Sequence, residues 1–323
     1  MTTTEAAVPA RTAARSASPR DRAATSERVD RLNTASLRRI VEPDTEVAGS
    51  IGPGRVIPAE LSIAAGLDLE LTEEQLVRLS REELASIVIA GIRFEALLMS
   101  GFASEIAFAG ELTDPRVTYM LHEIGEETRH SRLFVRLVDQ LAPTAVNPID
   151  VGVRHWIFRR VARALVRRPV VLCVLVLAGE EIPDLLQKKM VDHAETDPFV
   201  REVNRYHRME EARHLAYARM VLPELWQQAS ALDRLLVRRL VPLVAQTMLD
   251  GIVHPGVFAT VGLPAFATWR RAIRTPARVA LRREALRPVL GALLDGGVLR
   301  PGRIPVGWRR LCGVDAQGSP VES

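Results

Sequence analysis

Four long segments of the chain repeat apolar residues every three or four positions, the spacing that places them on one face of an α-helix. The first runs from Leu71 to Phe108 without proline, as one helix or two in succession, and Thr72 with Gln75 gives it a capping-box start. The second and the fourth, 114–141 and 197–222, each open with Asp-Pro, a frequent helix start. The third is the very apolar segment 169–190. No segment alternates as a strand does, so the predicted fold class is all-α.

Weaker patterns fill in the rest of the chain. Further helices are expected near 152–166, 229–250 and 264–295. Residues 1–55 are rich in Arg, Ala and Ser and lack sustained periodicity, so a mostly disordered tail is predicted there. The helical domain is expected to cover 56–300, and 301–323 is predicted to be a C-terminal loop or tail.

Composition narrows the class of protein. The chain is 47% hydrophobic and 25% charged, as in soluble globular proteins, and Cys173 and Cys312 form no disulfide framework or CxxC motif, which favours the cytoplasm. The net charge of +4 comes from scattered arginines without interleaved aromatics, so no nucleic-acid partner is expected. The most apolar run, 169–179, is shorter than the roughly 20 residues of a membrane span, so no membrane partner is expected either.

The fourth helical segment carries polar residues on its apolar side. At about 100° per residue, His207, Glu211 and His214 fall within a sector of about 60° that also contains Val203 and Ala218. A buried carboxylate is costly unless it is paired or bound to a metal. The pattern therefore indicates a metal site inside the fold.

The second segment repeats this feature one helix earlier. Glu127-x-x-His130 lies on the side of Met120, and the wider apolar stripe of the helix is expected to include Leu121 and Val135. In ferritin-like four-helix bundles, two such Glu-x-x-His pairs and a single Glu from each of two other helices hold two iron or manganese ions. The sequence predicts this fold, with additional helices around it.

The two single carboxylates lie upstream of the pairs. In the first segment Glu95 is preferred to Glu105, and in the third Glu180 and Glu181 are both candidates. Four carboxylates balance the charge of two divalent ions, and imidazoles complete the coordination. Acceptors for the outward nitrogens of the histidines are sought among Glu123, Glu210 and Asp184.

A metal-free alternative explains the same residues as a helical bundle with structural salt bridges. Arg129, Arg208 and Arg213 lie beside the proposed ligands and provide the cations for it. Residues expected near a substrate pocket, or in ordinary core, are Phe94, Leu98, Phe102, Leu177 and Tyr206.

The motifs resemble a known group of proteins. "EETRH" and "EEARH" resemble the carboxylate-bridged diiron superfamily, and "HRMEEARH" resembles the p-aminobenzoate N-oxygenase (AurF) type, which has an additional histidine ligand at that place. The resemblance covers about 83–221 and favours Glu180 over Glu181. The metal ligands it implies are Glu95, Glu127, His130, Glu180, His207, Glu211 and His214.

The resemblance also implies an activity. Such enzymes oxidise an amine to hydroxylamine, nitroso or nitro products with O₂, two iron ions and external electrons, here expected in specialised metabolism. The implied partners are a small-molecule amine and an electron donor or reductase, since the chain has no flavin, nicotinamide or iron–sulfur motif. No catalytic residue is assigned beyond the metal site, and a homodimer is compatible with this picture. The alternative within the superfamily is a desaturase or hydroxylase acting on carrier-protein-linked acyl groups.

Overall fold

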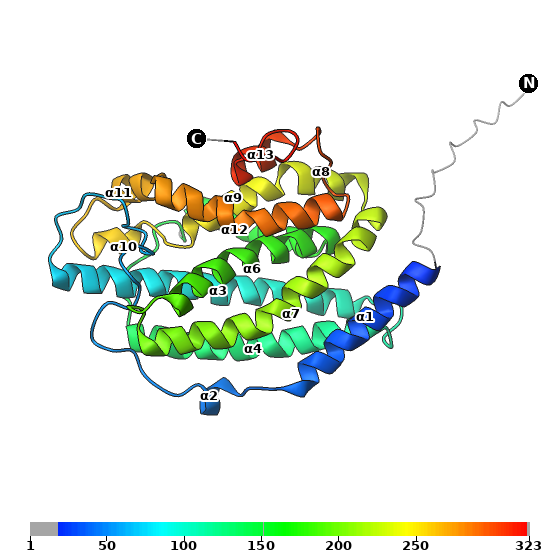
Figure 1. Ribbon diagram of the computed structural model, residues 1–323, viewed down its shortest axis with the longest axis horizontal. Helices are drawn as coiled ribbons and strands as arrows, with labels where there is room; N and C mark the ends of the chain where they lie inside the picture. Colours follow the sequence, from blue (N-terminus) through cyan, green and yellow to red (C-terminus); the bar gives the residue numbers. More distant parts are fainter. Residues whose placement is uncertain (1–18, 151, 322–323) are drawn as a thin grey trace, which may run out of the picture.

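Four long helices form the centre of the computed structural model, which describes residues 19–150 and 152–321. They are α3 (Glu73–Ala107), α4 (Pro115–Leu141), α6 (Pro169–Asp192) and α7 (Pro198–Gln228). Helix α3 packs along α4 and α6 along α7, and α3–α6 and α4–α7 contacts join the two pairs (Figure 1). The predicted all-α, ferritin-like bundle with additional helices is confirmed.

The start signals in the sequence begin the core helices. Thr72 caps α3 in a capping box with Gln75, and α3 continues as a single helix of 35 residues. Asp114 caps α4, with Pro115 in the first turn, and Asp197 caps α7 by accepting hydrogen bonds from two backbone amides. Each cap satisfies N–H groups that have no partner within the helix.

Two apolar clusters at opposite ends of the bundle show in which direction each core helix runs. The larger cluster includes Leu98 and Leu177, and the second includes Val88 and Phe134. Helices α3 and α7 pass from the second cluster to the larger one, whereas α4 and α6 pass the other way. The parallel pair α4 and α6 is joined by a long crossover that contains α5 (Gly152–Leu165), and one such crossover is typical of ferritin-like bundles.

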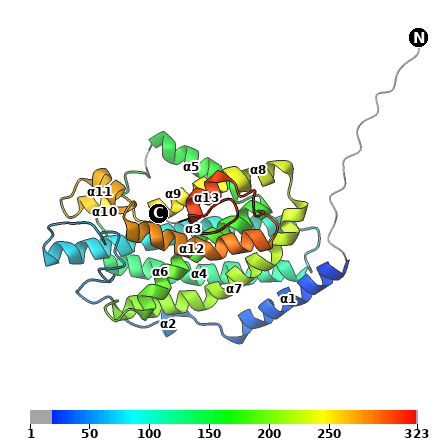
Figure 2. The ribbon, with the colours of Figure 1, turned by 45° about the horizontal axis from the view of Figure 1, so that its top comes forward.

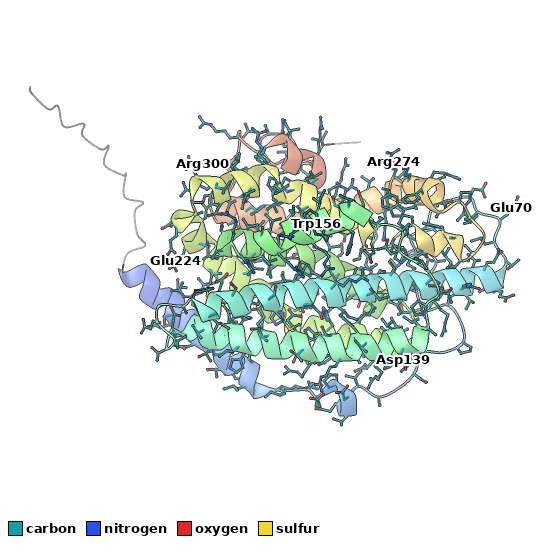
Figure 3. The ribbon with its side chains drawn as sticks, turned by 180° about the vertical axis from the view of Figure 1, so that it is seen from behind. Glu70, Asp139, Trp156, Glu224, Arg274 and Arg300 are labelled. Atoms are coloured by element: carbon teal, nitrogen blue, oxygen red, sulfur yellow. The ribbon has the colours of Figure 1, made fainter. Side chains whose placement is uncertain are left out.

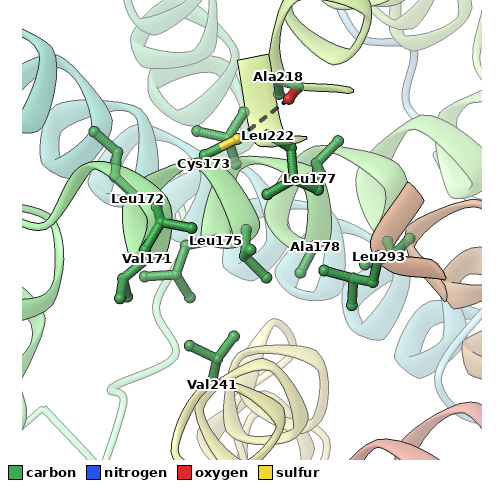
Figure 4. Close-up of a cluster of buried hydrophobic side chains, with 14 of the residues drawn as sticks. Val171, Leu172, Cys173, Leu175, Leu177, Ala178, Ala218, Leu222, Val241 and Leu293 are labelled. Atoms are coloured by element: carbon green, nitrogen blue, oxygen red, sulfur yellow. Dashed lines mark hydrogen bonds between the residues drawn. The ribbon is translucent and has the colours of Figure 1, made fainter. Parts of the chain in front are cut away.

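Helix α6 is buried on all sides in its first half, as its sequence predicts. The Cys173 thiol on α6 donates a hydrogen bond to the carbonyl of Ala218 on α7 at 3.2 Å (Figure 4). At Gly179 a Cβ atom would lie only 2.0 Å from Cζ of Phe94 on α3. Glycine therefore permits the close approach of α3 and α6 beside the candidate ligands Glu95 and Glu180.

Helix α3 is long and apolar enough to cross a bilayer by length and composition alone. Within the bundle, however, three of its carboxylates, Glu82, Glu83 and Glu95, are buried and hydrogen-bonded. Glu82 accepts from the backbone amides of Thr144 and Ala145, and Glu83 accepts from the amide of Ile63. These contacts tie α3 to the surrounding loops as a core helix of the bundle.

Shorter helices surround the bundle. α1 (Pro19–Arg38) lies against α4 and α7, α2 (Pro43–Glu46) lies against α4, and α8 (Ala231–Arg239), α9 (Val241–Gly251) and α12 (Pro276–Asp295) lie against α6. α10 (Gly256–Ala259) packs on α3 and on α11 (Ala265–Ala272), and α13 (Val306–Cys312) packs on α12 and α9. Figure 2 shows α5 above the α8, α9 and α13 layer. The predicted segments 229–250 and 264–295 are each split into two helices.

The two predicted tails differ from the structure. Part of the first, residues 1–18, lies outside the described residues, but α1 is a helix whose Val29 is fully buried and whose Asn33 donates to the carbonyl of Pro115. The inward face of α1 includes small polar residues such as Ser36, so the apolar residues of this helix do not recur at regular helical spacing in the sequence. In the segment 301–323, α13 places Trp308 in the core, and its seven residues are too few for a periodic signal.

The stripe predicted for α4 is also wrong at two positions. Leu121 and Val135 are 55% and 56% exposed, while Met120, Phe134 and the Glu127 side of the helix face inward. The buried face of α4 is therefore centred on the polar residues of the Glu127 side and not on a stripe through Leu121 and Val135.

We expect Trp308→Ala to lower the free energy of unfolding by about 3–5 kcal/mol, since the substitution empties a fully buried site. It also removes the hydrogen bond from the indole N–H to the carbonyl of Val237. Urea denaturation followed by circular dichroism measures the change. The control is Trp156→Ala on α5, where the ring is 57% exposed (Figure 3). Equal effects of the two variants would show that α13 is not part of the core.

Candidate metal centre

Two Glu-x-x-His pairs face each other halfway along α4 and α7. Glu127 and His130 come from α4 and Glu211 and His214 from α7, and each is at most 1% exposed. Nδ1 of His130 lies 3.4 Å from Oε2 of Glu127 and 3.3 Å from Oε1 of Glu211. Nδ1 of His214 lies 3.3 Å from Oε1 of Glu127 and 3.1 Å from Oε2 of Glu211. Each imidazole therefore faces both carboxylates.

The outward nitrogens of these histidines bind carboxylates of the opposite helix. Nε2–H of His130 donates to Glu210 at 3.0 Å, and Nε2–H of His214 donates to Glu126 at 2.8 Å. In the neutral imidazole, a proton fixed on Nε2 leaves the lone pair on Nδ1. Both lone pairs then point toward the carboxylates of Glu127 and Glu211.

Arginines complete this arrangement with an approximate twofold relation between α4 and α7. Arg129 on α4 donates to Glu210 on α7 at 3.1 Å, and Arg213 on α7 donates to Glu126 on α4 at 2.8 Å. Tyr206 adds a hydrogen bond to Glu210 at 3.1 Å. The arginines thus neutralise the outer carboxylate of each motif and leave the inner one free of guanidinium contacts.

His207 adds a third imidazole and breaks the twofold relation. Its Nε2 lies 3.5 Å from Oε1 of Glu95 and 3.4 Å from Oε1 of Glu211, while Nδ1–H donates to Oε1 of Gln187 at 3.0 Å. The other oxygen of Glu95 accepts a hydrogen bond from Ser131 at 2.6 Å. As in the other two histidines, the outward nitrogen is held by a protein acceptor and the inward one faces carboxylates.

Glu180 completes the group from α6. It is 3% exposed, and its pKa is raised well above the usual value by burial and by the negative charges of Glu211, Glu127 and Glu95. Its neighbour Glu181 instead pairs with Arg219.

Six of the seven predicted ligand residues are joined by contacts of 3.5 Å or less, and Glu180 lies close enough for the charges of three of them to raise its pKa. The less favoured Glu105 lies apart from them, in the wall of a cavity.

The histidines do not balance the charges of this group. Burial opposes the charged form of His130 and His214, but the facing carboxylates raise the pKa of both well above the usual value. Burial also opposes ionisation of Glu211, yet His214 and His207 hold its pKa well below the usual value. Burial raises the pKa of Glu95, as it does that of Glu180. Further positive charge is needed to keep all four carboxylates ionised.

The donor atoms fit bound metal ions. Oε1 of Glu127, Glu180 and Glu211 is buried in each case and accepts no hydrogen bond, which is unfavourable for a carboxylate oxygen. Three overlapping groups have ligand atoms within 4.8 Å of one another, and they are Glu95–His130–His207, Glu127–His130–Glu211 and Glu123–Glu127–His214. Carboxylate oxygens and imidazole nitrogens together suit iron, manganese or zinc.

Sequence reasoning missed several contacts of the histidines. It proposed Glu210 correctly, but Asp184 pairs with Arg208 in a partly exposed ion pair instead, and Gln187 and Glu126 were not considered. The doubled glutamate and the arginine shared by "EETRH" and "EEARH" are the signal that could have found Glu126. The arginines expected by the metal-free alternative bind these outer carboxylates and Asp184.

A cavity of about 250 Å³ adjoins the group between α3, α4, α6 and α7. Met120 and Val176 form part of its apolar wall, and Glu123 lines it as well. Glu123 is 1% exposed, burial raises its pKa to about 8, and its Oε2 accepts no hydrogen bond. Because Glu123 groups with Glu127 and His214, it joins the cavity to the candidate metal centre.

Of the five residues expected near a pocket, only Phe102 lines this cavity. Leu98 and Leu177 are fully buried in the larger apolar cluster, and Phe94 packs against Gly179. Tyr206 donates its hydroxyl to Glu210.

Comparison with known proteins places these features in a family. The family model described as p-aminobenzoate N-oxygenase AurF matches residues 67–297, a range that contains all four core helices. Three curated proteins described as uncharacterized, one from Mycobacterium bovis and two from strains of Mycobacterium tuberculosis, are 26% identical over 185 residues. The match covers 57% of this chain and 54% of each relative, so the chain spans about half their length.

We expect Glu126→Ala and Glu210→Ala each to lower the affinity for iron(II) by about 10- to 100-fold, because each removes the acceptor that orients a histidine. Competitive titration with a chelator measures the affinity. The control is Asp184→Ala, which breaks an ion pair away from the cluster and leaves the affinity unchanged. Wild-type affinity in both glutamate variants would contradict the assigned role of the cross-helix contacts.

Proposed function

This chain belongs to the p-aminobenzoate N-oxygenase AurF family, a family of diiron oxygenases, and from this premise we propose that it oxidises the nitrogen of an amine. In the first step, R–NH₂, O₂, two electrons and two protons give R–NHOH and water, and further rounds give nitroso and nitro products. The substrate is an arylamine or a similar amine, and the reaction belongs to specialised metabolism.

The observation that carries this proposal is the third imidazole. His207 directs one nitrogen at Glu95 and Glu211 while Gln187 holds the other, the same arrangement as in the two Glu-x-x-His histidines. A histidine kept for packing alone has no need of two buried carboxylates around its inward nitrogen.

The seven residues of the group are the proposed ligands of two iron ions. Their inward nitrogens and free carboxylate oxygens are the donor atoms, and the outer acceptors Glu126, Glu210 and Gln187 hold the imidazoles in place. When bound, the iron ions supply the redox electrons and the open coordination positions at which O₂ is activated.

The chain's own residues prepare the site for an amine. Met120, Leu172 and Val176 give the cavity an apolar wall that excludes bulk water from the reacting group. At the edge of the metal group, Oε2 of Glu123 has no hydrogen-bond partner among the described residues. We assign it the role of accepting a hydrogen bond from the N–H of the substrate, which orients the nitrogen.

The reaction also needs a source of electrons and a cellular location. We propose that electrons come from an external donor or reductase, that the protein works in the cytoplasm and that it can form a homodimer. These assignments, like the substrate, belong to the proposal.

The alternative of an acyl desaturase or hydroxylase is less well supported. The cavity beside the group measures about 250 Å³, below the range of about 300–1,000 Å³ typical of sites for drug-sized ligands. This volume suits a compact amine better than a long acyl chain.

The test loads the protein anaerobically with iron(II), reduces it and adds O₂ with a panel of arylamines. We expect about two irons per chain by elemental analysis, and products with added oxygen at nitrogen by mass spectrometry. We expect His207→Ala to lose iron and to slow product formation by at least about tenfold, because it removes a proposed ligand.

The matched control is Arg205→Ala, two residues away on the same helix, where the side chain is exposed and pairs with Glu202. It should retain both iron and activity. Two irons that His207→Ala does not affect would point to the desaturase-like site instead. Iron-loaded protein that oxidises no amine in the panel would overturn the N-oxygenase proposal.

A further inference from the structure

The charged residues of the cavity beside the metal group are mostly acidic. Glu105 and Glu111 come from α3 and the loop after it, Asp114 caps α4, and Glu123 lies two turns further along α4. The cationic residue in the lining is Arg116. Carboxyl groups in a lining of this kind favour positively charged and hydrogen-bond-donating molecules over anions.

Arg116 is already engaged by acidic neighbours. Its guanidinium forms an ion pair with Asp114 at 3.0 Å and a second one with Glu224, from the last part of α7, at 3.3 Å. These two carboxylates already offset the single positive charge of Arg116, so a carboxylate group on a substrate would gain little net attraction there. The cavity therefore offers no free cation among the described lining residues to anchor an anionic substrate.

Two carboxyl groups of the lining remain available as acceptors. Glu123 is 1% exposed, and its Oε2 has no hydrogen-bond partner. No described residue donates a hydrogen bond to the side chain of Glu105, and burial, opposed by Arg116, raises its pKa to about 7. A cation placed beside Glu105 would lower that pKa and form an ion pair with the carboxylate.

The two acceptors differ in their position relative to the metal group. Glu123 shares a group with Glu127 and His214, whereas Glu105 lies in the last turn of α3, away from the proposed ligands. The cavity thus has an acceptor at its metal end and another at a distance from it. Leu172 and Val176 belong to the apolar part of the same lining.

We propose that this cavity selects amines that carry a second group, cationic or hydrogen-bond-donating, and that it discriminates against carboxylate-bearing arylamines. The reacting amine lies at Glu123, the apolar body of the substrate lies between the two acceptors, and the second group binds Glu105. This inference rests on the proposed function and specifies its substrate class.

The experiment uses three probes with the same aniline ring and different groups at the far end. 4-Aminobenzylamine carries a positive charge at neutral pH, 4-aminobenzyl alcohol is neutral, and 4-aminobenzoate is negative. Isothermal titration calorimetry with the iron-loaded enzyme, without reductant, measures binding in the absence of turnover. We expect the cation to bind at least about tenfold more tightly than the anion, with the neutral probe between them.

Variants of Glu105 assign the selectivity to one side chain. Glu105→Gln keeps the shape, so the cation should lose its advantage over the neutral probe, and Glu105→Lys should reverse the order of cation and anion. The control is Glu74→Gln at the exposed start of the same helix, which should leave all three affinities unchanged. Circular dichroism verifies that each variant is folded.

The outcomes separate this inference from the proposed function. Equal or tighter binding of 4-aminobenzoate, no binding of any probe, or a preference that Glu105→Gln does not change would overturn the inference. A separate assay with reductant and O₂ tests N-oxygenation by mass spectrometry. Selective binding of the cation without oxidation of any amine would uphold the selectivity and overturn the N-oxygenase function. Preferred oxidation of 4-aminobenzoate would do the reverse.

Discussion

The structure depends on the burial of four carboxylates at one level of an apolar bundle. Glu95, Glu127, Glu180 and Glu211 each come from a different core helix, and each is at most 3% exposed. Apolar clusters lie on both sides of this layer, so solvent cannot screen the mutual repulsion of the carboxylates. Imidazoles relieve part of it, and the donor set fits metal cations that would relieve the rest. The bundle is thus built around a charge that its side chains do not fully balance.

The cross-helix contacts explain why these carboxylates coexist with so many arginines. The two glutamates of each motif have different partners. The outer one, Glu126 or Glu210, binds the histidine and the arginine of the opposite helix. The inner one, Glu127 or Glu211, has no guanidinium contact among the described residues. A guanidinium contact at Glu127 or Glu211 would compete with a metal ion for the same oxygens. Because Arg129 and Arg213 bind the outer glutamates, their positive charges lie close to the metal centre without contacting its inner carboxylates.

Much of this could be predicted from the sequence, because polar residues at helical spacing on an apolar face have few explanations. Glu127, His130, His207, Glu211 and His214 follow from helical spacing, whereas the ligand role of His207 as an additional histidine and the choice of Glu180 over Glu181 needed the resemblance to a family. The packing of Trp308 and Val29 could not be predicted, because a seven-residue helix and a face with small polar residues carry little periodic signal. The outer acceptor Glu126 was missed because contacts between helices depend on their rotation about their own axes.

The third imidazole gives the centre two unlike ends. His130 and His207 lie with their ring centroids 4.4 Å apart and share a group with Glu95, while His214, at the other end, is grouped with Glu127 and Glu123. The cavity reaches the centre through Glu123, so a small molecule in it meets the end that holds one histidine and not the end that holds two. The near-duplicate motifs on α4 and α7 therefore build a centre with a front and a back.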